Sequence, residues 1–243
     1  MNLFRQYFGS LFRSLRWGVE AGVALAILTA GTPAFADIAK PGDIIAGHNQ
    51  LYWAEQWWQW AVGVPAPNNP LLDTTGANAG VNNNGSVFFV AGVAGSGTVA
   101  RTFTVPSGRP IFIPVVNGVY APIGTDGGFD PSPCKAPLQF SCAIQTATGT
   151  FSPLHSMLLQ IDGVTLNPKE LQSYRQTSTT YFSATLPPNN IFGVTGPVTS
   201  PSWVQDGYYV TLTNLSRGSH LLVFRARWGA GAQLNVIDTI IVQ

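Results

Sequence analysis

Charged side chains are scarce in this sequence. Asp, Glu, Lys and Arg make up 9% of the 243 residues, against about 25% in an average globular protein. Twelve basic residues face eleven acidic ones, so neither sign dominates. The chain therefore lacks the excess of positive charge that attracts nucleic acid or an anionic membrane, and we expect no nucleic-acid partner. The surface is expected to be Ser, Thr, Asn, Gln and Gly, which suits uncharged ligands such as sugars.

Catalytic and cofactor motifs are missing as well. The sequence contains neither G-x-S-x-G nor H-E-x-x-H. The glycine-rich stretch 92–97 lacks the lysine of a phosphate-binding loop and precedes a predicted strand. The histidines His48, His155 and His220 have no metal-ligand spacing. Residues 126–130 contain two aspartates but not the EF-hand pattern. We expect no cofactor and no metal site.

No apolar run is long enough to span a bilayer. The longest, residues 22–30, falls well short of the ~20 residues that a transmembrane helix needs. It follows three arginines and ends near the small residues of Ala-Phe-Ala at 34–36. This arrangement is typical of a secretory signal peptide. We expect residues 1–36 to be removed on export to the periplasm or the medium; the alternative is an anchor that stays attached.

Residues 37–243 are expected to form a single domain. Without the leader, nine basic residues face ten acidic ones, a net charge of about −1. All-β domains of this length are often single. A chain of this size buries about 70% of its unfolded surface, which is enough for a stable core.

Cysteine occurs only twice, at Cys134 and Cys142. In an oxidising compartment two cysteines this close are expected to form a disulfide. Both lie in residues 117–154, which show little periodicity and are predicted to be a long loop. Such a loop is often functional; the alternative is that the bridge only protects an insertion from proteolysis.

Aromatic residues are concentrated in one predicted helix, residues 49–62, with the sequence NQLYWAEQWWQWAV. Its apolar arc covers more than half of the circumference, wider than a surface helix needs. The helix is therefore expected to lie deep against a sheet, with Trp57 and Trp58 in the core. Pro65 and Pro67 end it.

Other aromatic and amide side chains of this helix are candidates for binding. Exposed aromatic rings stack on sugar faces and act as anchors. Tyr52 and Gln59 lie on the polar side of the predicted helix, and Trp60 lies near the boundary. We predict that Tyr52, Gln59 and Trp60 contact a ligand.

After the helix the apolar period changes from 3.6 to 2, which indicates strands. About nine are predicted, at residues 86–91, 98–105, 110–116, 156–162, 164–166, 179–186, 207–214, 220–228 and 233–242. Pro114 inside one of them indicates a bulge or an edge position. Helices between the strands are missing, so we expect an all-β fold, a two-sheet antiparallel β-sandwich or jelly roll of about eight or nine strands.

Three titratable residues are weak catalytic candidates. Glu55 on the helix and Asp206 before a strand could form the carboxylate pair of a glycosidase, which requires the two acids ~5–10 Å apart. His220 begins a strand and could join them. In that strand Arg225 and Arg227 share a face, and Asp238 on the next strand is a candidate acidic partner.

Several blocks of the sequence resemble a family of secreted bacterial proteins. The most specific are WWQWA at 57–61 and NPLLDTTG at 69–76, followed by VFFVAG at 87–92 and DGYY at 206–209. The resemblance covers most of residues 37–243 and implies one exported, β-rich domain. It implies no activity and no catalytic residues.

Two functions follow as expectations. The first is a secreted, non-catalytic binding or envelope-associated protein, with carbohydrate as the leading ligand class. The alternative is a hydrolase or lyase acting on an extracellular polysaccharide, with Glu55, Asp206 or His220 in its site.

Overall fold

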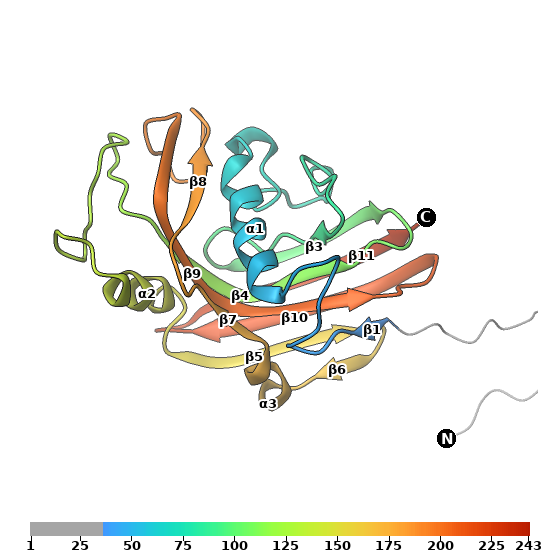
Figure 1. The fold of residues 1–243 in the computed structure, drawn as a ribbon. Coiled ribbons are helices and arrows are strands. Elements are labelled where there is room, and N and C mark those ends of the chain that lie inside the picture. The colour runs from blue at the N-terminus through green and yellow to red at the C-terminus, as the bar shows by residue number, and fades with distance from the viewer. Residues whose placement is uncertain (1–35) are drawn as a thin grey trace, which may run out of the picture. The chain divides into compact units, whose positions relative to one another are not determined.

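The computed structural model describes residues 36–243 of the chain. The predicted signal peptide, apart from Ala36, lies outside the described residues. The described part is rich in strands and contains few helices (Figure 1). None of its helices is long and apolar enough to cross a membrane.

The first sheet has six strands built around the sixteen-residue β9 (Val198–Thr213). Its order is β1-β9-β4-β2, and β7 and β8 also pair with β9. The partner strands are β1 (Asp37–Ile38), β2 (Phe88–Phe89), β4 (Ile111–Tyr120), β7 (Arg175–Thr177) and β8 (Phe182–Leu186). The β2–β4 pair is parallel and the others are antiparallel.

The second sheet has five strands in the order β3-β11-β10-β5-β6. These are β3 (Gly97–Val105), β5 (Leu154–Ile161), β6 (Val164–Leu166), β10 (Gly218–Trp228) and β11 (Ala232–Val242). Here β3 runs parallel to β11, and the remaining pairs are antiparallel.

The two sheets share one apolar core. Strand alternation points Ile113 and Val210 of the first sheet towards Leu159 and Phe224 of the second, and all four are fully buried. Alternate residues of the first sheet, such as Phe112, are buried on its other face. The first sheet is therefore covered on both faces.

Helix α1 (Gln50–Gly63) covers that other face (Figure 1). It begins at Asn49, whose side chain accepts a hydrogen bond from the backbone of Tyr52. Trp57 and Trp58 are buried, with 1% and 7% of their surface exposed. Their position in the core, predicted from the width of the apolar arc, is confirmed.

Indole hydrogen bonds fix the helix to its surroundings. The Nε1 atoms of Trp53, Trp57 and Trp60 donate to the carbonyls of Ile45, Val90 and Val81, at 2.7, 2.8 and 2.8 Å. A buried Trp is costly unless this proton finds an acceptor. The helix is thus held by directed contacts as well as by apolar packing.

Short helical segments complete the described part. They are α2 (Phe140–Gly149), α3 (Pro168–Leu171) and two 3₁₀ turns at Ala66–Asn68 and Gln172–Tyr174. A complete capping box formed by Asn167 and Glu170 begins α3.

The structure corrects the predicted architecture in two respects. The sheets are mixed instead of purely antiparallel, and they contain eleven strands instead of eight or nine. Period-2 alternation shows which face of a strand is buried, but it does not show in which direction the neighbouring strand runs. The added strands, β1 and β7, have two and three residues, too few for a visible alternation.

Residues 117–154 are not one irregular loop. They contain the end of β4 and the ten-residue helix α2. The apolar residues Phe140, Ala143, Ile144 and Ala147 have helical spacing, and Ala143 and Ala147 are fully buried. The intervening threonines, which favour strands, hide this period.

The proposed partner of Arg225 and Arg227 is also wrong. Asp238 lies opposite Leu222 on the buried face of its sheet. It forms a buried ion pair with Arg101 of β3, with 2.8 Å between Nη2 and Oδ2. The alternation along β11 decides this, because even-numbered residues face inwards while the two arginines face outwards.

Candidate ligand-binding pocket

An apolar pocket of about 380 Å³ lies beside β4. The strand β2 pairs only with Ile111 and Phe112, so the following part of β4 has no strand on that side. Pro114 lines the pocket at the point where the register with β9 shifts. The register shift agrees with the bulge or edge position predicted from this proline, which has no backbone N–H to donate.

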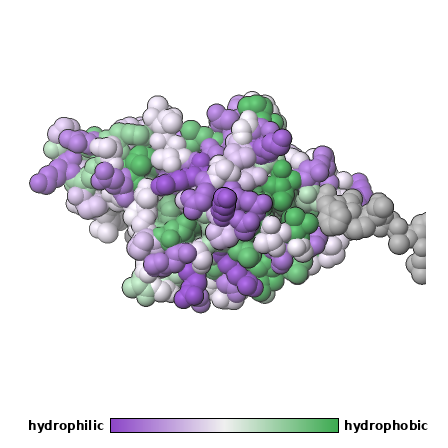
Figure 2. Space-filling view, turned by 90° about the horizontal axis from the view of Figure 1, so that it is seen from below, coloured by the Kyte–Doolittle hydropathy of each residue, from purple (hydrophilic) through white to green (hydrophobic). Residues whose placement is uncertain are grey.

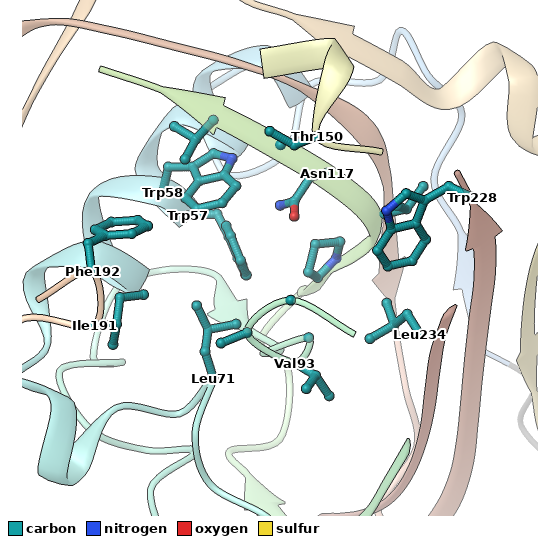
Figure 3. A pocket seen from close by; sticks show the side chains of 17 residues that line it. Trp57, Trp58, Leu71, Val93, Asn117, Thr150, Ile191, Phe192, Trp228 and Leu234 are labelled. Carbon is teal, nitrogen blue, oxygen red and sulfur yellow. The ribbon is translucent and has the colours of Figure 1, made fainter. Parts of the chain in front are cut away.

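Aromatic rings from distant parts of the chain surround the pocket (Figure 3). Trp58 of α1 and Phe192 of the loop after β8 lie on one side, and Trp228 at the end of β10 lies on the other. Phe192 is 47% exposed, while Trp58 is almost fully buried. The remaining lining residues are Trp57, Leu71, Gly92, Val93, Ala94, Gly95, Pro114, Val116, Asn117, Gly118, Val119, Thr150, Ile191 and Leu234.

Two polar side chains, Asn117 and Thr150, enter this apolar lining (Figure 3). Asn117 Nδ2 donates to the hydroxyl of Tyr209 at 3.2 Å. Among the described residues no hydrogen bond reaches the Oδ1 atom of Asn117, so this acceptor remains for a ligand. A few polar groups in an apolar cavity of ~300–1,000 Å³ are typical of small-molecule sites.

A buried network orients this asparagine. The Tyr209 hydroxyl also accepts from Trp58 Nε1 at 3.1 Å and donates to Gln205 Oε1 at 2.7 Å. Complete burial raises the pKa of Tyr209, so the group remains a neutral phenol. The pocket floor is therefore held by a chain of uncharged hydrogen bonds from β4, β9 and α1.

A second, smaller pocket of about 220 Å³ adjoins the first. Val119 and Phe192 line both. The other lining residues of the smaller pocket are Tyr120, Ala121, Ile123, Leu186, Val194 and Trp203. Phe192 thus stands between two neighbouring apolar hollows.

The predicted binding residues of α1 lie elsewhere. Trp60 is buried and packs on Trp57 and Phe89. Tyr52 stacks on His48, with 3.8 Å between the ring centroids. Gln59 donates to the carbonyl of Ser183 at 2.8 Å. None of the three lines the larger pocket, and their role in binding stays a prediction.

The predicted catalytic residues do not line the larger pocket either. Glu55 accepts a hydrogen bond from Ser178, and burial raises its pKa despite this bond. Asp206 is fully buried in β9 and bonds to Arg175, Thr148 and Thr177. Thr177, which bonds to Asp206, and Ser178, which bonds to Glu55, are adjacent in the chain, so the two acids belong to neighbouring segments.

His220 belongs to the other sheet. Its Nδ1 lies 2.6 Å from Asp162 Oδ2, and its Nε2 lies 2.9 Å from the carbonyl oxygen of Ser216. These contacts tie the turn after β9 to the turn after β5. The structure therefore does not bring His220 to the two carboxylates as one catalytic group.

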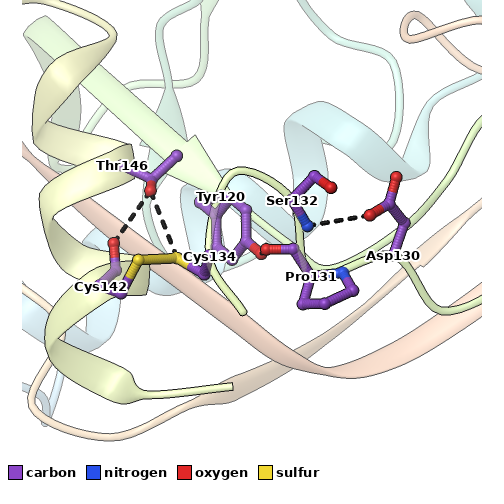
Figure 4. Close-up of a disulfide and its surroundings, with 7 residues drawn as sticks. All are labelled: Tyr120, Asp130, Pro131, Ser132, Cys134, Cys142 and Thr146. Carbon is purple, nitrogen blue, oxygen red and sulfur yellow. Dashed lines mark hydrogen bonds between the residues drawn. A yellow bond between two sulfur atoms is a disulfide. The ribbon is translucent and has the colours of Figure 1, made fainter. Parts of the chain in front are cut away.

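The disulfide predicted between Cys134 and Cys142 is confirmed (Figure 4). It joins the loop after β4 to the first turn of α2. Tyr120 donates to the carbonyl of Pro131 at 2.6 Å and fixes the same loop to the end of β4. The bridge thus orders the segment that carries Thr150 to the pocket.

The aspartates of residues 126–130 form local turns. Asp126 accepts from the backbone of Gly128, and Asp130 accepts from Ser132. Within residues 36–243, no group of three or more His, Cys, Asp or Glu side chains is arranged to hold a metal ion.

The principal lining residues Asn117, Phe192 and Trp228 were missed at the sequence level. Two of them stand beside glycines, in Asn117-Gly118 and Phe192-Gly193, where the chain turns or packs closely. This is a weak signal, since turns without function have the same composition. Trp228 ends a predicted strand and carries no signal of its own.

Comparison with known proteins adds little. The chain matches no family model and no curated protein sequence. The solution structure of amebosin matches at 11% identity and a TM-score of 0.22, over 60% of this chain and 96% of that one. This likeness carries no argument about fold or function. The resemblance to secreted bacterial proteins remains a prediction.

Proposed function

We propose that residues 37–243 form an exported, non-catalytic binding domain, and that the aromatic pocket beside β4 binds a saccharide unit of a glycan or of another envelope component. The observation that carries the proposal is the placement of Phe192 and Trp228 on opposite sides of the Asn117 side chain. A sugar ring has apolar C–H faces and polar edges, and this arrangement offers aromatic surface to the faces and an amide to an edge.

The lining contains no charged side chain. Glycan hydroxyls need hydrogen-bond partners and no counter-charge, so Asn117, Thr150 and the backbone of residues 92–95 suffice for a neutral sugar. The disulfide fits an oxidising compartment outside the cytoplasm. The two face-to-face sheets form a sandwich that supports the pocket.

The alternative is a polysaccharide hydrolase or lyase. Such an enzyme needs titratable groups that converge on the bound sugar. Glu55 and Asp206 lie outside the pocket lining, and Asp206 already bonds to three side chains. We therefore prefer binding to catalysis.

The test is binding of neutral oligosaccharides to the mature domain, screened on a glycan array and followed by tryptophan fluorescence. Trp58 and Trp228 line the pocket, so a ligand should change the emission. We expect Phe192→Ala and Asn117→Ala to weaken binding at least tenfold, since each removes a direct contact.

Phe129→Ala is the matched control. Phe129 is 67% exposed on the loop after β4 but does not line the pocket. It should leave affinity unchanged. An equal loss of affinity in Phe129→Ala and Phe192→Ala would contradict the proposal. A glycan array on which the domain binds no neutral glycan would also contradict it. Release of reducing ends from a bound polymer would instead support the enzyme.

A further inference from the structure

The outer face of the second sheet carries a groove of about 570 Å³. It lies across β3, β11, β10 and β5, on the side away from the core. Its outward-facing polar residues are Thr98, Ser156, Arg225, Arg227, Gln233 and Asn235. Leu234 of β11 is the one residue that lines both this groove and the aromatic pocket.

Strand pairing places these side chains in two rows. In the first row Arg225 is opposite Asn235 of β11 on one side and Leu158 of β5 on the other. In the second row Arg227 is opposite Gln233 and Ser156. Residues two apart on a strand share a face, so the two guanidinium groups project side by side.

Neither arginine is neutralised by the described part of the protein. The acidic groups that lie within ion-pairing distance of a basic side chain in residues 36–243 are Asp238 beside Arg101, Asp206 beside Arg175 and Asp162 beside the imidazole of His220. Arg225 and Arg227 are both exposed and belong to none of them. The rest of the groove lining is uncharged: it consists of the other polar residues named above and of Met157, Leu158, Pro168 and Leu234. Two adjacent like charges repel each other, so an anionic ligand that lies between them would relieve this repulsion.

One of the two arginines is oriented. Arg225 Nε donates to Asn235 Oδ1 at 2.7 Å. This bond uses the inner nitrogen and leaves both terminal nitrogens for another acceptor. The guanidinium edge that remains matches a carboxylate, which it can bind with two parallel hydrogen bonds.

We propose that this groove binds an acidic polysaccharide, with uronate carboxylates held by Arg225 and Arg227 and sugar hydroxyls by Ser, Thr, Asn and Gln. A polymer fits better than a free acid, because the charges form a pair along the strand within a groove several strands wide. Nucleic acid fits less well, since residues 37–243 carry a net charge of about −1 and no wider basic surface. Seen from below in Figure 2, hydrophilic residues lie among hydrophobic ones.

The experiment is affinity electrophoresis of the mature domain in gels that contain polygalacturonate. The fully methyl-esterified polymer, which has the same backbone without charge, is the comparison. We expect retardation by the acid form at low salt, weakened by roughly 0.5 M NaCl because exposed charges are screened. Each of Arg225→Gln and Arg227→Gln should reduce affinity roughly fivefold.

Arg217→Gln is the control for net charge. Arg217 is exposed in the turn between β9 and β10 and lies outside the groove. Arg217→Gln should leave retardation unchanged. Phe192→Ala, in the aromatic pocket, should also leave it unchanged, so a wrong proposal for the groove can be distinguished from a wrong proposal for the pocket. All variants should keep the melting temperature of the unaltered domain.

Four results with the polymers and the variants would overturn the proposal. They are retardation that survives loss of both arginines, equal weakening by Arg217→Gln, equal retardation by the methyl ester, and tighter binding to duplex DNA than to the uronate polymer. Binding of monomeric galacturonate with the affinity of the polymer would also contradict it, because the site would then be a small-anion site.

Discussion

Arg175 and Asp206 form an ion pair that joins β7 to β9, with 2.6 Å between Nη2 and Oδ2. The Asp206 side chain is completely buried, whereas 44% of the Arg175 side chain is exposed. Burial by itself raises the pKa of Asp206, but hydrogen bonds from Arg175, Thr148 and Thr177 outweigh it and hold the pKa below its usual value. One carboxylate thus ties together α2, β7 and β9.

This arrangement predicts loss of stability in acid. The pKa of Asp206 is lower in the folded state than in the unfolded state, where it is about 3.9. Its contribution is therefore complete above that value and is lost as the pH falls through the lower folded-state pKa. Asp206→Asn should cost about 2–3 kcal/mol at pH 7 and flatten the decline of stability below about pH 4. Urea unfolding at several pH values measures both.

Asp43→Asn serves as the comparison for this measurement. Asp43 is exposed, and among residues 36–243 its side chain accepts only the backbone N–H of Lys40. It should change the free energy of unfolding by well under about 1 kcal/mol. An Asp206→Asn variant with unchanged acid sensitivity would show that another group controls the acid transition.

The tryptophans of α1 are predicted to stabilise the fold. Trp57→Ala and Trp58→Ala each empty a buried aromatic site and should cost about 3–5 kcal/mol, with a collapse of soluble yield. Tyr52→Ala and Gln59→Ala remove partly exposed side chains and should leave the melting temperature almost unchanged. Thermal unfolding followed by circular dichroism tests this. A Trp57→Ala variant that folds normally and only loses binding would refute it.

The disulfide is predicted to order its own segment and not the sheets. Cys134 and Cys142 are eight residues apart, so by chain entropy the bridge contributes roughly 2–3 kcal/mol. Reduction should raise hydrogen exchange in residues 121–149 and leave β10 and β11 protected. The intact mass of the native protein should be lower than that of the reduced form by two hydrogens. Thiol labelling of the unreduced protein would contradict the bridge.

Gly118 is predicted to set the distance between β4 and α2. A Cβ atom there would collide with Thr150 Oγ1 and with the carbonyl oxygen of Ala147. Gly118→Ala should therefore displace the end of α2, cost about 1–3 kcal/mol and weaken ligand binding, because Thr150 lines the pocket. Gly149→Ala, with nothing near its Cβ position, should do neither. Equal stabilities of the two variants would disprove the close packing.

Signal-peptide cleavage is predicted after Ala36. The chain that remains would begin at Asp37, which is the first residue of β1. The Asp37 side chain accepts a hydrogen bond from Asn214. N-terminal sequencing of the exported protein should begin at Asp37. Recovery of an intact amino terminus on membranes after export would contradict cleavage and favour an anchor.

Local patterns anticipated much of the fold. The range predicted for the aromatic helix, 49–62, agrees with α1 within one residue at each end. The strands predicted at 98–105 and 233–242 match β3 and β11 equally closely. These elements are long and strongly periodic, and the period follows from the geometry of the helix or strand itself.

The prediction failed where elements are short or where distant partners decide. The parallel pairing of β3 with β11 joins residues more than a hundred positions apart. The local spacing of apolar residues does not show whether two distant strands run parallel or antiparallel. Likewise, Asp238 pairs with Arg101 and not with the arginines of β10. To predict this pair, one must know which residues of β3, β10 and β11 face the same side of the sheet.

By itself the sequence determined the positions of β3, β11 and α1, the burial of Trp57 and Trp58, and the pairing of its two cysteines. The helix, the strands and the buried tryptophans follow from residues that lie close together in the sequence. The disulfide follows because the chain has only two cysteines. Only the tertiary structure brought Asn117, Phe192 and Trp228 around one pocket and left Arg225 and Arg227 without an ion-pair partner among the described residues on an outer face. Those relationships arise from contacts between segments that the chain separates widely, and sheet packing alone brings such segments together.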